Sequence, residues 1–265
     1  MGADGRKSIF ITGAASGIGL ATAKRFAKEG WFVGLADIDA TGLTLAQGEI
    51  GAANCSTHKL DVRDRAAWKA EMEAFGKATG GRLDALLNNA GIANYGFFED
   101  QTEDEIDRQI DINIKGVSNG ARAGIDLLKA TPGSTLINVA SCAGLFGAPK
   151  MAMYCATKFA VRGLSEALDI EFSRFGVAVR CIMPWFVDTP ILQAGSAGSN
   201  ENIADAIRAG GSEVYTVEEA ADVIWRSLQA SEVHSIVGKA GRQLRFATRF
   251  MPGSLRKRMK ASMPA

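Results

Sequence analysis

A serine, a tyrosine and a lysine are spaced in this chain so that they could perform acid–base chemistry together. Tyr154 and Lys158 stand four residues apart, and Ser141 precedes the tyrosine by thirteen residues. In a helix, positions i and i+4 share one face, so the lysine ammonium would lie close to the tyrosine phenol. A phenol ordinarily loses its proton at about pH 10, and a nearby positive charge lowers that pKa. The spacing predicts a general base that works near neutral pH, although many helices carry this pair with both side chains in solvent.

The N-terminal segment has the pattern of a phosphate-binding turn. Residues 8–11 are mostly apolar and predict a buried strand, and Gly13, Gly17 and Gly19 follow it before an amphipathic stretch that ends at Gly30. Glycines permit a tight turn and a close backbone approach to a pyrophosphate, whose charge the free amides at a helix start favour. Such glycines often form only a turn, but the position between a strand and a helix favours a dinucleotide.

A carboxylate follows the second candidate strand, residues 31–36, at Asp37. A carboxylate about twenty residues beyond the glycine turn can accept hydrogen bonds from the adenosine ribose and would repel a 2′-phosphate. Ile38 follows it where a cation could stand, and residues 14–16 offer no cation either. The sequence therefore favours NAD over NADP, with a strand-end or helix-capping role for Asp37 as the alternative.

Together the motifs resemble the short-chain dehydrogenase/reductase family over roughly residues 8–240. They are Thr12-Gly-x3-Gly-Ile-Gly19, Asn88-Asn89-Ala90-Gly91, Asn113, Ser141, Tyr154-x3-Lys158, and Pro184 through Val187 to Thr189. The resemblance implies an α/β fold: a Rossmann-like, doubly wound parallel sheet of about seven strands with helices on both faces, in three α/β/α layers. It also implies an oxidoreductase.

The resemblance implies a catalytic role for four residues. Ser141 would hydrogen-bond the substrate oxygen, and Tyr154 would exchange a proton with it. Lys158 would lower the tyrosine pKa and hold the nicotinamide ribose. Asn113 would hold a water molecule in a proton relay.

The resemblance likewise implies a set of NAD-binding residues that includes Tyr154 and Lys158. The others are Gly13, Ser16, Gly17, Ile18, Gly19, Asp37, Ile38, Asp61, Val62, Asn89, Ala90, Gly91, Pro184, Val187 and Thr189. Residues 61–62 would flank the adenine, residues 89–91 would line the adenosine ribose side, and Thr189 would bond the nicotinamide carboxamide.

Apolar residues follow several expected strands at their carboxyl ends, where open parallel sheets bind ligands. The expected substrate pocket consists of Ala93, Phe97, Phe146, Met151, Trp185, Phe186 and Leu192. Trp185 stands where the family usually has glycine, so we expect its indole to narrow the pocket, with core packing as the alternative. Lys150 is the only cation in these segments. The pocket predicts a hydrophobic secondary alcohol or its ketone as substrate.

The chain as a whole predicts one catalytic domain over residues 1–265, because strand and helix patterns alternate throughout. Capping boxes at Thr102–Glu105 and Thr216–Glu219 predict two helix starts. A net charge of +1 gives no field that would attract nucleic acid, and the four cysteines lack metal-site spacing, so no metal is expected. A cytoplasmic location is expected, since neither a secretory signal nor a sufficiently long apolar run is present.

Three further segments carry expectations. Residues 190–215 are rich in small and polar residues and are a candidate substrate lid, or else a plain surface loop. Residues 105–129 and 154–174 predict long helices, through which similar proteins pair as homodimers or homotetramers.

A basic tail occupies residues 239–265, with apolar residues between its cations. Pro252 and Gly253 would break it into two short helices. Such a tail can contact an anionic membrane surface, or it can pack over its own domain or a neighbouring subunit.

Two classes of function are consistent with the sequence. The first is an NAD-dependent alcohol dehydrogenase or ketone reductase, with an NADPH-dependent ketone reductase as its variant. The second is a dinucleotide-binding sensor without turnover. The presence of Tyr154, Lys158, Ser141 and Asn113 favours the enzyme, because a sensor would be expected to lose one of them.

Overall fold

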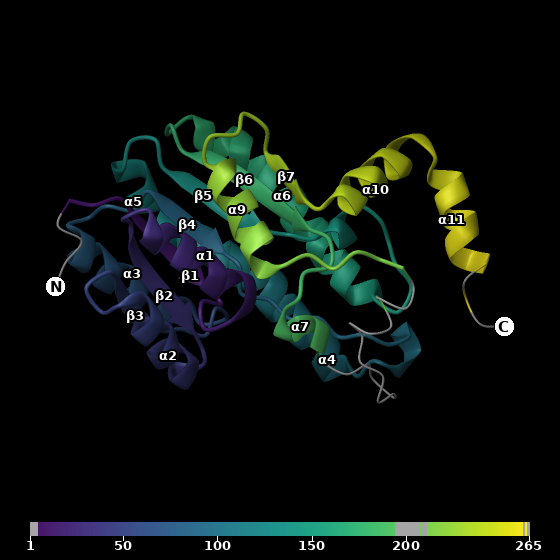
Figure 1. Ribbon diagram of the computed structural model, residues 1–265, viewed down its shortest axis with the longest axis horizontal. Coiled ribbons are helices and arrows are strands. Elements are labelled where there is room, and N and C mark those ends of the chain that lie inside the picture. The colour runs from purple at the N-terminus through teal and green to yellow at the C-terminus, as the bar shows by residue number, and fades with distance from the viewer. Residues whose placement is uncertain (1–4, 194–206, 208–210, 262, 264–265) are drawn as a thin grey trace.

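The computed structural model describes residues 5–193, 207, 211–261 and 263, and these contain one parallel sheet (Figure 1). Its strands are β1 Ser8–Thr12, β2 Phe32–Asp37, β3 Cys55–Lys59, β4 Ala85–Asn88, β5 Thr135–Val139, β6 Ala178–Pro184 and β7 His234–Val237. Their order is β3-β2-β1-β4-β5-β6-β7, so the winding direction reverses between β1 and β4. Ligands bind at such a reversal, beyond the carboxyl ends of the strands. The doubly wound α/β fold expected from the sequence is confirmed.

Helices cover both faces of the sheet. They are α1 Gly17–Lys28, α2 Ala40–Ile50, α3 Arg65–Thr79, α4 Glu103–Ile110, α5 Gly116–Ala130, α6 Ala152–Ser173, α7 Pro190–Gln193, α9 Val217–Ser227, α10 Lys239–Phe250 and α11 Pro252–Ala261. One layer pairs α1 with α9, while the other pairs α3 with α5 and α4 with α6. Both expected capping boxes are present, at the starts of α4 and α9.

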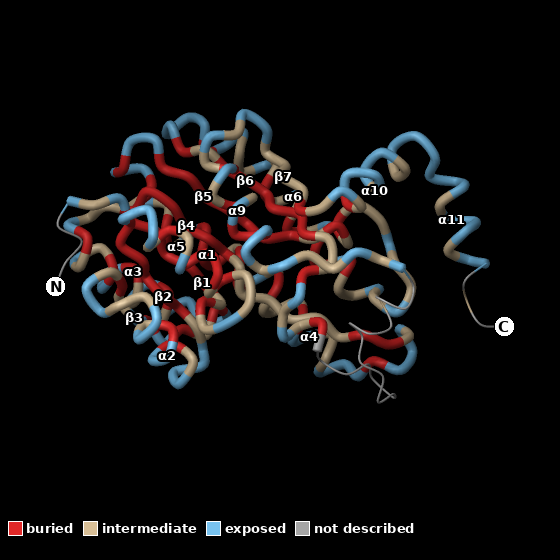
Figure 2. The backbone as a smooth tube through the Cα atoms, in the orientation of Figure 1, coloured by how far each residue is buried: buried red, intermediate tan, exposed pale blue. Residues whose placement is uncertain are grey.

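The two largest hydrophobic clusters lie on opposite faces of the sheet. Buried residues are concentrated along its strands (Figure 2). Side chains alternate across a strand, so Ile9 and Ile11 pack on the side of α1, and Phe10 packs on the side of α3. Phe26 of α1 lies in the first cluster, and Phe75 of α3 meets the Phe10 ring edge-on in the second. These layers fix the strand ends that carry the site.

The helix expected over residues 105–129 is interrupted by a π turn at Asp111–Lys115. The Gly116 amide there bonds to the Asp111 carbonyl, five residues back. The turn holds Asn113 in full burial. Short π segments inside helices frequently mark functional sites.

Two segments were singled out in the sequence, the candidate lid and the basic tail. Most of the candidate lid, residues 194–206 and 208–210, lies outside the described residues; within the rest of residues 190–215, Tyr215 forms a parallel bridge with Val187. The basic tail forms α10 and α11, separated at Met251 as the Pro252 pattern predicts, at the end of the molecule away from the N-terminus (Figure 1). No helix among the described residues is long and apolar enough to cross a membrane.

Candidate active site

The glycine turn leaves backbone amides free for a ligand. Gly13 and Gly17 have φ of +68° and +53°, a region that residues with a side chain rarely adopt. A Cβ on Gly19 would lie 2.0 Å from the Gly13 carbonyl oxygen, so only glycine permits this close packing. Ser16 begins α1 without a side-chain capping bond, and the first turn has no acidic residue. The helix start therefore fits the pyrophosphate of a dinucleotide.

Asp37 lies at the carboxyl end of β2, beside this turn. One of its carboxylate oxygens accepts a hydrogen bond from the Ala15 amide, and the other from the Asp39 amide, both at 3.0 Å. These bonds orient the carboxylate and leave it room to accept bonds from a ribose. Ile38 next to it is 61% exposed and supplies no charge.

Two adjoining cavities lie beyond the strand ends, and they share Ile18, Asn89, Gly91, Thr189 and Ile191. The first has a volume of about 550 Å³ and is lined, among the expected cofactor residues, by Gly13, Ser16, Gly17, Ile18, Asp37, Ile38, Asp61, Val62, Asn89, Ala90, Gly91 and Thr189. The second has a volume of about 360 Å³ and is lined by Tyr154, Lys158, Pro184 and Val187 in addition to the shared residues. Gly19 lines neither cavity, since it packs behind the turn. The pair suits a ligand with two halves.

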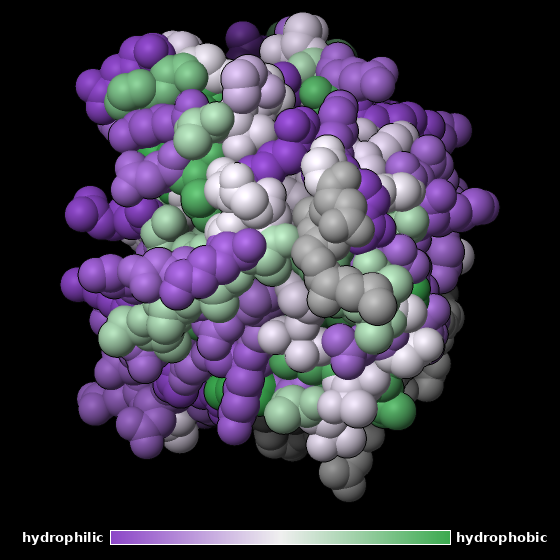
Figure 3. Space-filling model, turned by 90° about the vertical axis from the view of Figure 1, so that its left-hand side faces the viewer, coloured by the Kyte–Doolittle hydropathy of each residue, from purple (hydrophilic) through white to green (hydrophobic). Residues whose placement is uncertain are grey.

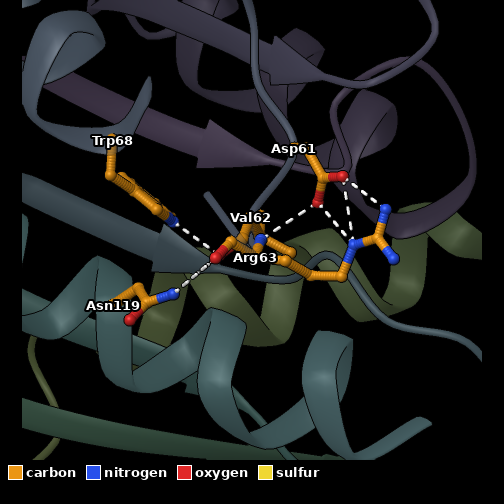
Figure 4. A network of polar contacts seen from close by, with 5 residues as sticks. All are labelled: Asp61, Val62, Arg63, Trp68 and Asn119. Atoms are coloured by element: carbon orange, nitrogen blue, oxygen red, sulfur yellow. Dashed lines mark hydrogen bonds and ion pairs between the residues drawn. The ribbon is translucent and has the colours of Figure 1, made fainter. Parts of the chain in front are cut away.

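The Asp61–Val62 segment is held by several side chains (Figure 4). The Val62 carbonyl accepts hydrogen bonds from the Trp68 indole and the Asn119 amide, at 3.0 and 3.1 Å. Both Asp61 oxygens accept bonds from the Arg63 guanidinium, which lowers the pKa of the Asp61 carboxyl. The carboxylate expected beside the adenine is thus already paired with Arg63.

Two arginines that the sequence did not single out also line the larger cavity. Arg63 directly follows the Asp61–Val62 pair, and Arg108 comes from α4, far from the other motifs in the chain. They bring positive charge near the adenosine end of the site. In the sequence, only the position of Arg63 directly after the Asp61–Val62 pair indicated that it would line the cavity.

Ser141, Tyr154 and Lys158 meet in the smaller cavity. The Lys158 ammonium lies 5.5 Å from the centre of the Tyr154 ring and donates a hydrogen bond to the Val139 carbonyl at 3.0 Å. The Ser141 hydroxyl accepts a bond from the Ala143 amide at 3.1 Å and caps the short helical turn that follows β5. The spacing of the motif therefore corresponds to one cluster in space.

Burial dominates the protonation of this cluster. It raises the pKa of Tyr154 to about 12, while a hydrogen bond with the Ser141 side chain acts to lower it. It also lowers the pKa of Lys158 to about 8. The low tyrosine pKa expected from the lysine is absent in the protein alone, because the loss of solvation around the phenol outweighs the opposing effects.

Asn113 lies near Lys158, but its side-chain amide forms hydrogen bonds with other residues. Its amide oxygen accepts a bond from the Ile92 amide, and its amide nitrogen donates to the Ile92 carbonyl and the Thr157 hydroxyl, at 2.9 to 3.1 Å. A Cβ on Gly91 would lie 3.2 Å from Asn113 Oδ1 and 3.5 Å from Lys158 Nζ. In the protein alone, Asn113 therefore fixes the loop after β4.

The smaller cavity has a largely apolar wall. Of the expected pocket residues, it is lined by Phe146, Met151, Trp185, Phe186 and Leu192. Ala93 lines the larger cavity instead, and Phe97 lines neither; its ring lies under the Lys150 ammonium at 5.0 Å. Tyr95, Leu244 and Met259 also line it, the last two from α10 and α11. In the sequence, the only indication that Leu244 and Met259 would line the cavity was the presence of apolar residues between the cations of the tail.

Trp185 has both roles that the sequence left open. It lines the cavity, and it packs against the hydrophobic cluster that includes Val161 and Met183. Its ring meets Phe186 edge-on at 5.0 Å. Lys150 is the only described non-glycine residue with a positive φ, so Trp185 replaces the usual glycine without left-handed strain.

Comparisons with known proteins agree with this geometry. A family model described as short chain dehydrogenase matches residues 7–200. The 2,5-dichloro-2,5-cyclohexadiene-1,4-diol dehydrogenase LinX of Sphingobium indicum is 38% identical over 187 residues, which cover 70% of this chain and 74% of LinX. The 3-alpha-(or 20-beta)-hydroxysteroid dehydrogenase of Mycobacterium bovis is 38% identical over 186 residues, 70% of each chain. A short-chain dehydrogenase/reductase of Burkholderia phymatum in complex with NAD superposes with a TM-score of 0.83 at 25% identity, covering 100% of this chain and 99% of its own.

Proposed function

The chain belongs to the short-chain dehydrogenase/reductase family, and from this premise we propose that it interconverts a hydrophobic secondary alcohol and its ketone with NAD(H). The observation that carries the proposal is the cluster of Ser141, Tyr154 and Lys158 in an apolar cavity. That cavity adjoins the larger one, which is lined by the glycine turn and Asp37.

The residues of the cluster divide the work of the reaction. The Tyr154 hydroxyl exchanges a proton with the substrate oxygen, and the Ser141 hydroxyl donates a hydrogen bond to the same oxygen. The Lys158 ammonium favours the phenolate form of Tyr154 when the tyrosine acts as a base. NAD held by the glycine turn and Asp37 would supply a hydride acceptor for the carbinol carbon, and NADH would supply the hydride donor for the carbonyl carbon in the reverse direction. Asn113 holds the loop beside Lys158, and its part in a water-mediated proton relay remains a proposal.

The apolar wall supports a hydrophobic substrate, and the names of two relatives refer to a cyclohexadiene diol and to hydroxysteroids. We expect apolar secondary alcohols such as cyclohexanols and hydroxysteroids to produce NADH, measured by its absorbance, while alcohols that bear a carboxylate do not. Trp185→Gly should extend the range toward bulkier alcohols, and an unchanged range would contradict the role of the indole. Tight NADH binding without turnover on any alcohol would favour the sensor instead.

Asp37 is expected to set the cofactor preference. Asp37→Ala should improve the kcat/KM ratio of NADP over NAD by at least roughly tenfold, equivalent to about 1.4 kcal/mol, because a charge that repels a 2′-phosphate is removed. Asp37→Asn keeps the shape of the side chain and should give much of the same change if charge is the cause. If neither variant alters the preference for NAD over NADP, Asp37 does not set it.

NADP(H) use is the second candidate, because Arg63 and Arg108 line the adenosine-side cavity. Arg63 is already paired with Asp61, which reduces the charge it can offer to a phosphate. If NADP(H) were nevertheless the cofactor, Arg63→Gln should weaken NADPH binding more than NADH binding. Equal effects on both would keep NAD as the assignment.

Alcohol oxidation should become faster as pH rises, because oxidation needs the phenolate of Tyr154. Below a pKa of about 12 the phenolate fraction rises about tenfold per pH unit. Above the Lys158 pKa of about 8 the ammonium is lost, so the gain should flatten there. Ketone reduction needs the protonated phenol and should vary little over the same range. Rates of both directions at a series of pH values test this, and an oxidation rate that falls between about pH 6 and 8 would contradict it.

Pairing through α4–α5 and α6, the segments 105–129 and 154–174, remains our proposal for a homodimer or homotetramer. On α6, Phe159 and Ile170 are 42% and 76% exposed, which supports a covered face. Sedimentation equilibrium would measure the mass, and a monomer at micromolar concentration would rule the proposal out. A single catalytic domain over residues 1–265, a lid over residues 190–215 and a cytoplasmic location also remain proposals.

A further inference from the structure

The two C-terminal helices carry charge of one sign. From residue 233 onward the chain has eight basic residues and no Asp or Glu: Lys239, Arg242, Arg245, Arg249, Arg256, Lys257, Arg258 and Lys260. Because the whole chain carries +1, the remainder carries −7. All eight are exposed, and within the described part of the chain none forms an ion pair. Their charge is therefore available to a partner.

Helix α10 has an inner face packed on the domain and an outer face that is apolar as well as basic. On the inner side, Gly241 is buried where an added Cβ would meet Cys142, and Leu244 lines the substrate cavity. On the outer side, Phe246 and Phe250 are 57% and 62% exposed, and their ring centres lie 4.7 Å apart. Exposed apolar side chains that lie together are typical of interaction surfaces.

Helix α11 continues this surface with little support from the domain. It has no buried residue and packs mainly on α10 (Figures 1 and 2). Leu255 and Met259 are its half-buried apolar residues, and Met259 reaches the wall of the substrate cavity. The same two helices thus present cations and aromatic rings outward and wall the apolar cavity inward.

We propose that α10 and α11 dock on an anionic lipid bilayer and bring the mouth of the substrate cavity to it. Basic helices with exposed Phe and Leu side chains insert their apolar groups at the headgroup boundary, and anionic lipids attract their cations. A hydrophobic alcohol would then enter the cavity past Leu244 and Met259 directly from the bilayer, a step that rests on the proposed function. The opposite end of the molecule shows a mainly hydrophilic surface (Figure 3).

A second copy of the chain is the competing occupant, because the remainder of each chain is acidic. That contact would satisfy the cations and could also cover the aromatic rings, because protein interfaces are enriched in aromatic residues and Arg. It gives no reason for apolar cavity walls on the same helices. The bilayer accounts for the charge, the exposed rings and the cavity walls at Leu244 and Met259 together, and the cavity walls favour it over a second copy.

The test is co-sedimentation of the full chain with vesicles of phosphatidylcholine, with and without phosphatidylglycerol, in the absence of cofactor and substrate. We expect binding only to the anionic vesicles, weakened by salt. Phe246→Ser with Phe250→Ser, and separately Arg249, Arg256, Lys257 and Lys260 changed to Gln, should each reduce the bound fraction at least tenfold. The matched control changes four exposed lysines at the other layers of the fold to Gln: Lys28, Lys59, Lys69 and Lys77.

Each outcome decides the question. The proposal would be overturned if the wild-type protein does not co-sediment with anionic vesicles, or if the tail variants bind them as the wild type does. Tail variants with an unchanged circular-dichroism melt but a smaller mass in solution, together with no vesicle binding, would assign the surface to a second copy. Because no turnover is measured, the result is independent of whether the proposed reaction is correct.

Discussion

Tyr154→Phe is expected to lower kcat for alcohol oxidation by about 10²- to 10⁴-fold, the usual contribution of a positioned general acid or base. The change removes only the hydroxyl that exchanges the proton and bonds to Ser141. The ring stays under the Lys158 ammonium, and the adenosine-side cavity is untouched. NADH affinity, measured by fluorescence titration, should therefore change by less than about threefold, or about 0.7 kcal/mol.

Tyr95→Phe is the matched control, because Tyr95 lines the same cavity and burial raises its pKa as well. Its expected effect on kcat is less than about tenfold, because Tyr95 is not a member of the Ser141, Tyr154 and Lys158 motif. If Tyr95→Phe abolishes turnover and Tyr154→Phe does not, the acid–base role belongs to the other tyrosine.

Gly19→Ala is expected to disrupt NAD binding and to lower stability. The new Cβ would lie 2.0 Å from the Gly13 carbonyl oxygen and 2.8 Å from the Asn89 amide nitrogen. Both neighbours belong to the cofactor cradle, and a backbone oxygen cannot rotate away as a side chain can. Overpacking of this kind costs about 1–3 kcal/mol. A lower melting temperature and an NADH affinity reduced at least roughly tenfold are the expected measurements.

Gly48→Ala supplies the control for that substitution. Gly48 is exposed in α2, and a Cβ there would meet nothing within 4 Å. Alanine is the better helix former by about 1 kcal/mol, so this variant should melt at or above the wild-type temperature and bind NADH normally. An equal loss in both variants would mean that the close packing at Gly19 is not the cause.

Features that depend on neighbours in the chain could be predicted from the sequence. The short apolar run at residues 8–11 predicted β1, and the glycines after it predicted the turn, because both depend on local backbone preference. Thr102 and Glu105 predicted the start of α4 for the same reason. The placement of Asp37 at a strand end next to the turn follows from the βαβ unit alone.

Features that depend on contacts across the chain could not be predicted. The partners of Asn113 lie 21 and 44 residues away, and they determine that its amide holds the Ile92 loop. Phe97 was expected in the pocket, but its ring lies against the Lys150 ammonium instead, a contact between residues 53 positions apart in the chain. The tyrosine pKa is a further case, since the loss of solvation is decided by everything packed around the phenol.

The sequence by itself determined the α/β fold, the order of the motifs and the identity of the residues that can exchange a proton or cradle a dinucleotide. Backbone preference and residue chemistry act over a few positions, so these properties are present in the spacing of Ser141, Tyr154 and Lys158. Only the tertiary structure decided how deeply that cluster is buried and that Arg63 forms an ion pair with Asp61. It also decided that residues of α10 and α11 line the substrate cavity. Burial and long-range contacts arise only when the layers pack, and they set both the proton affinity of the site and its access.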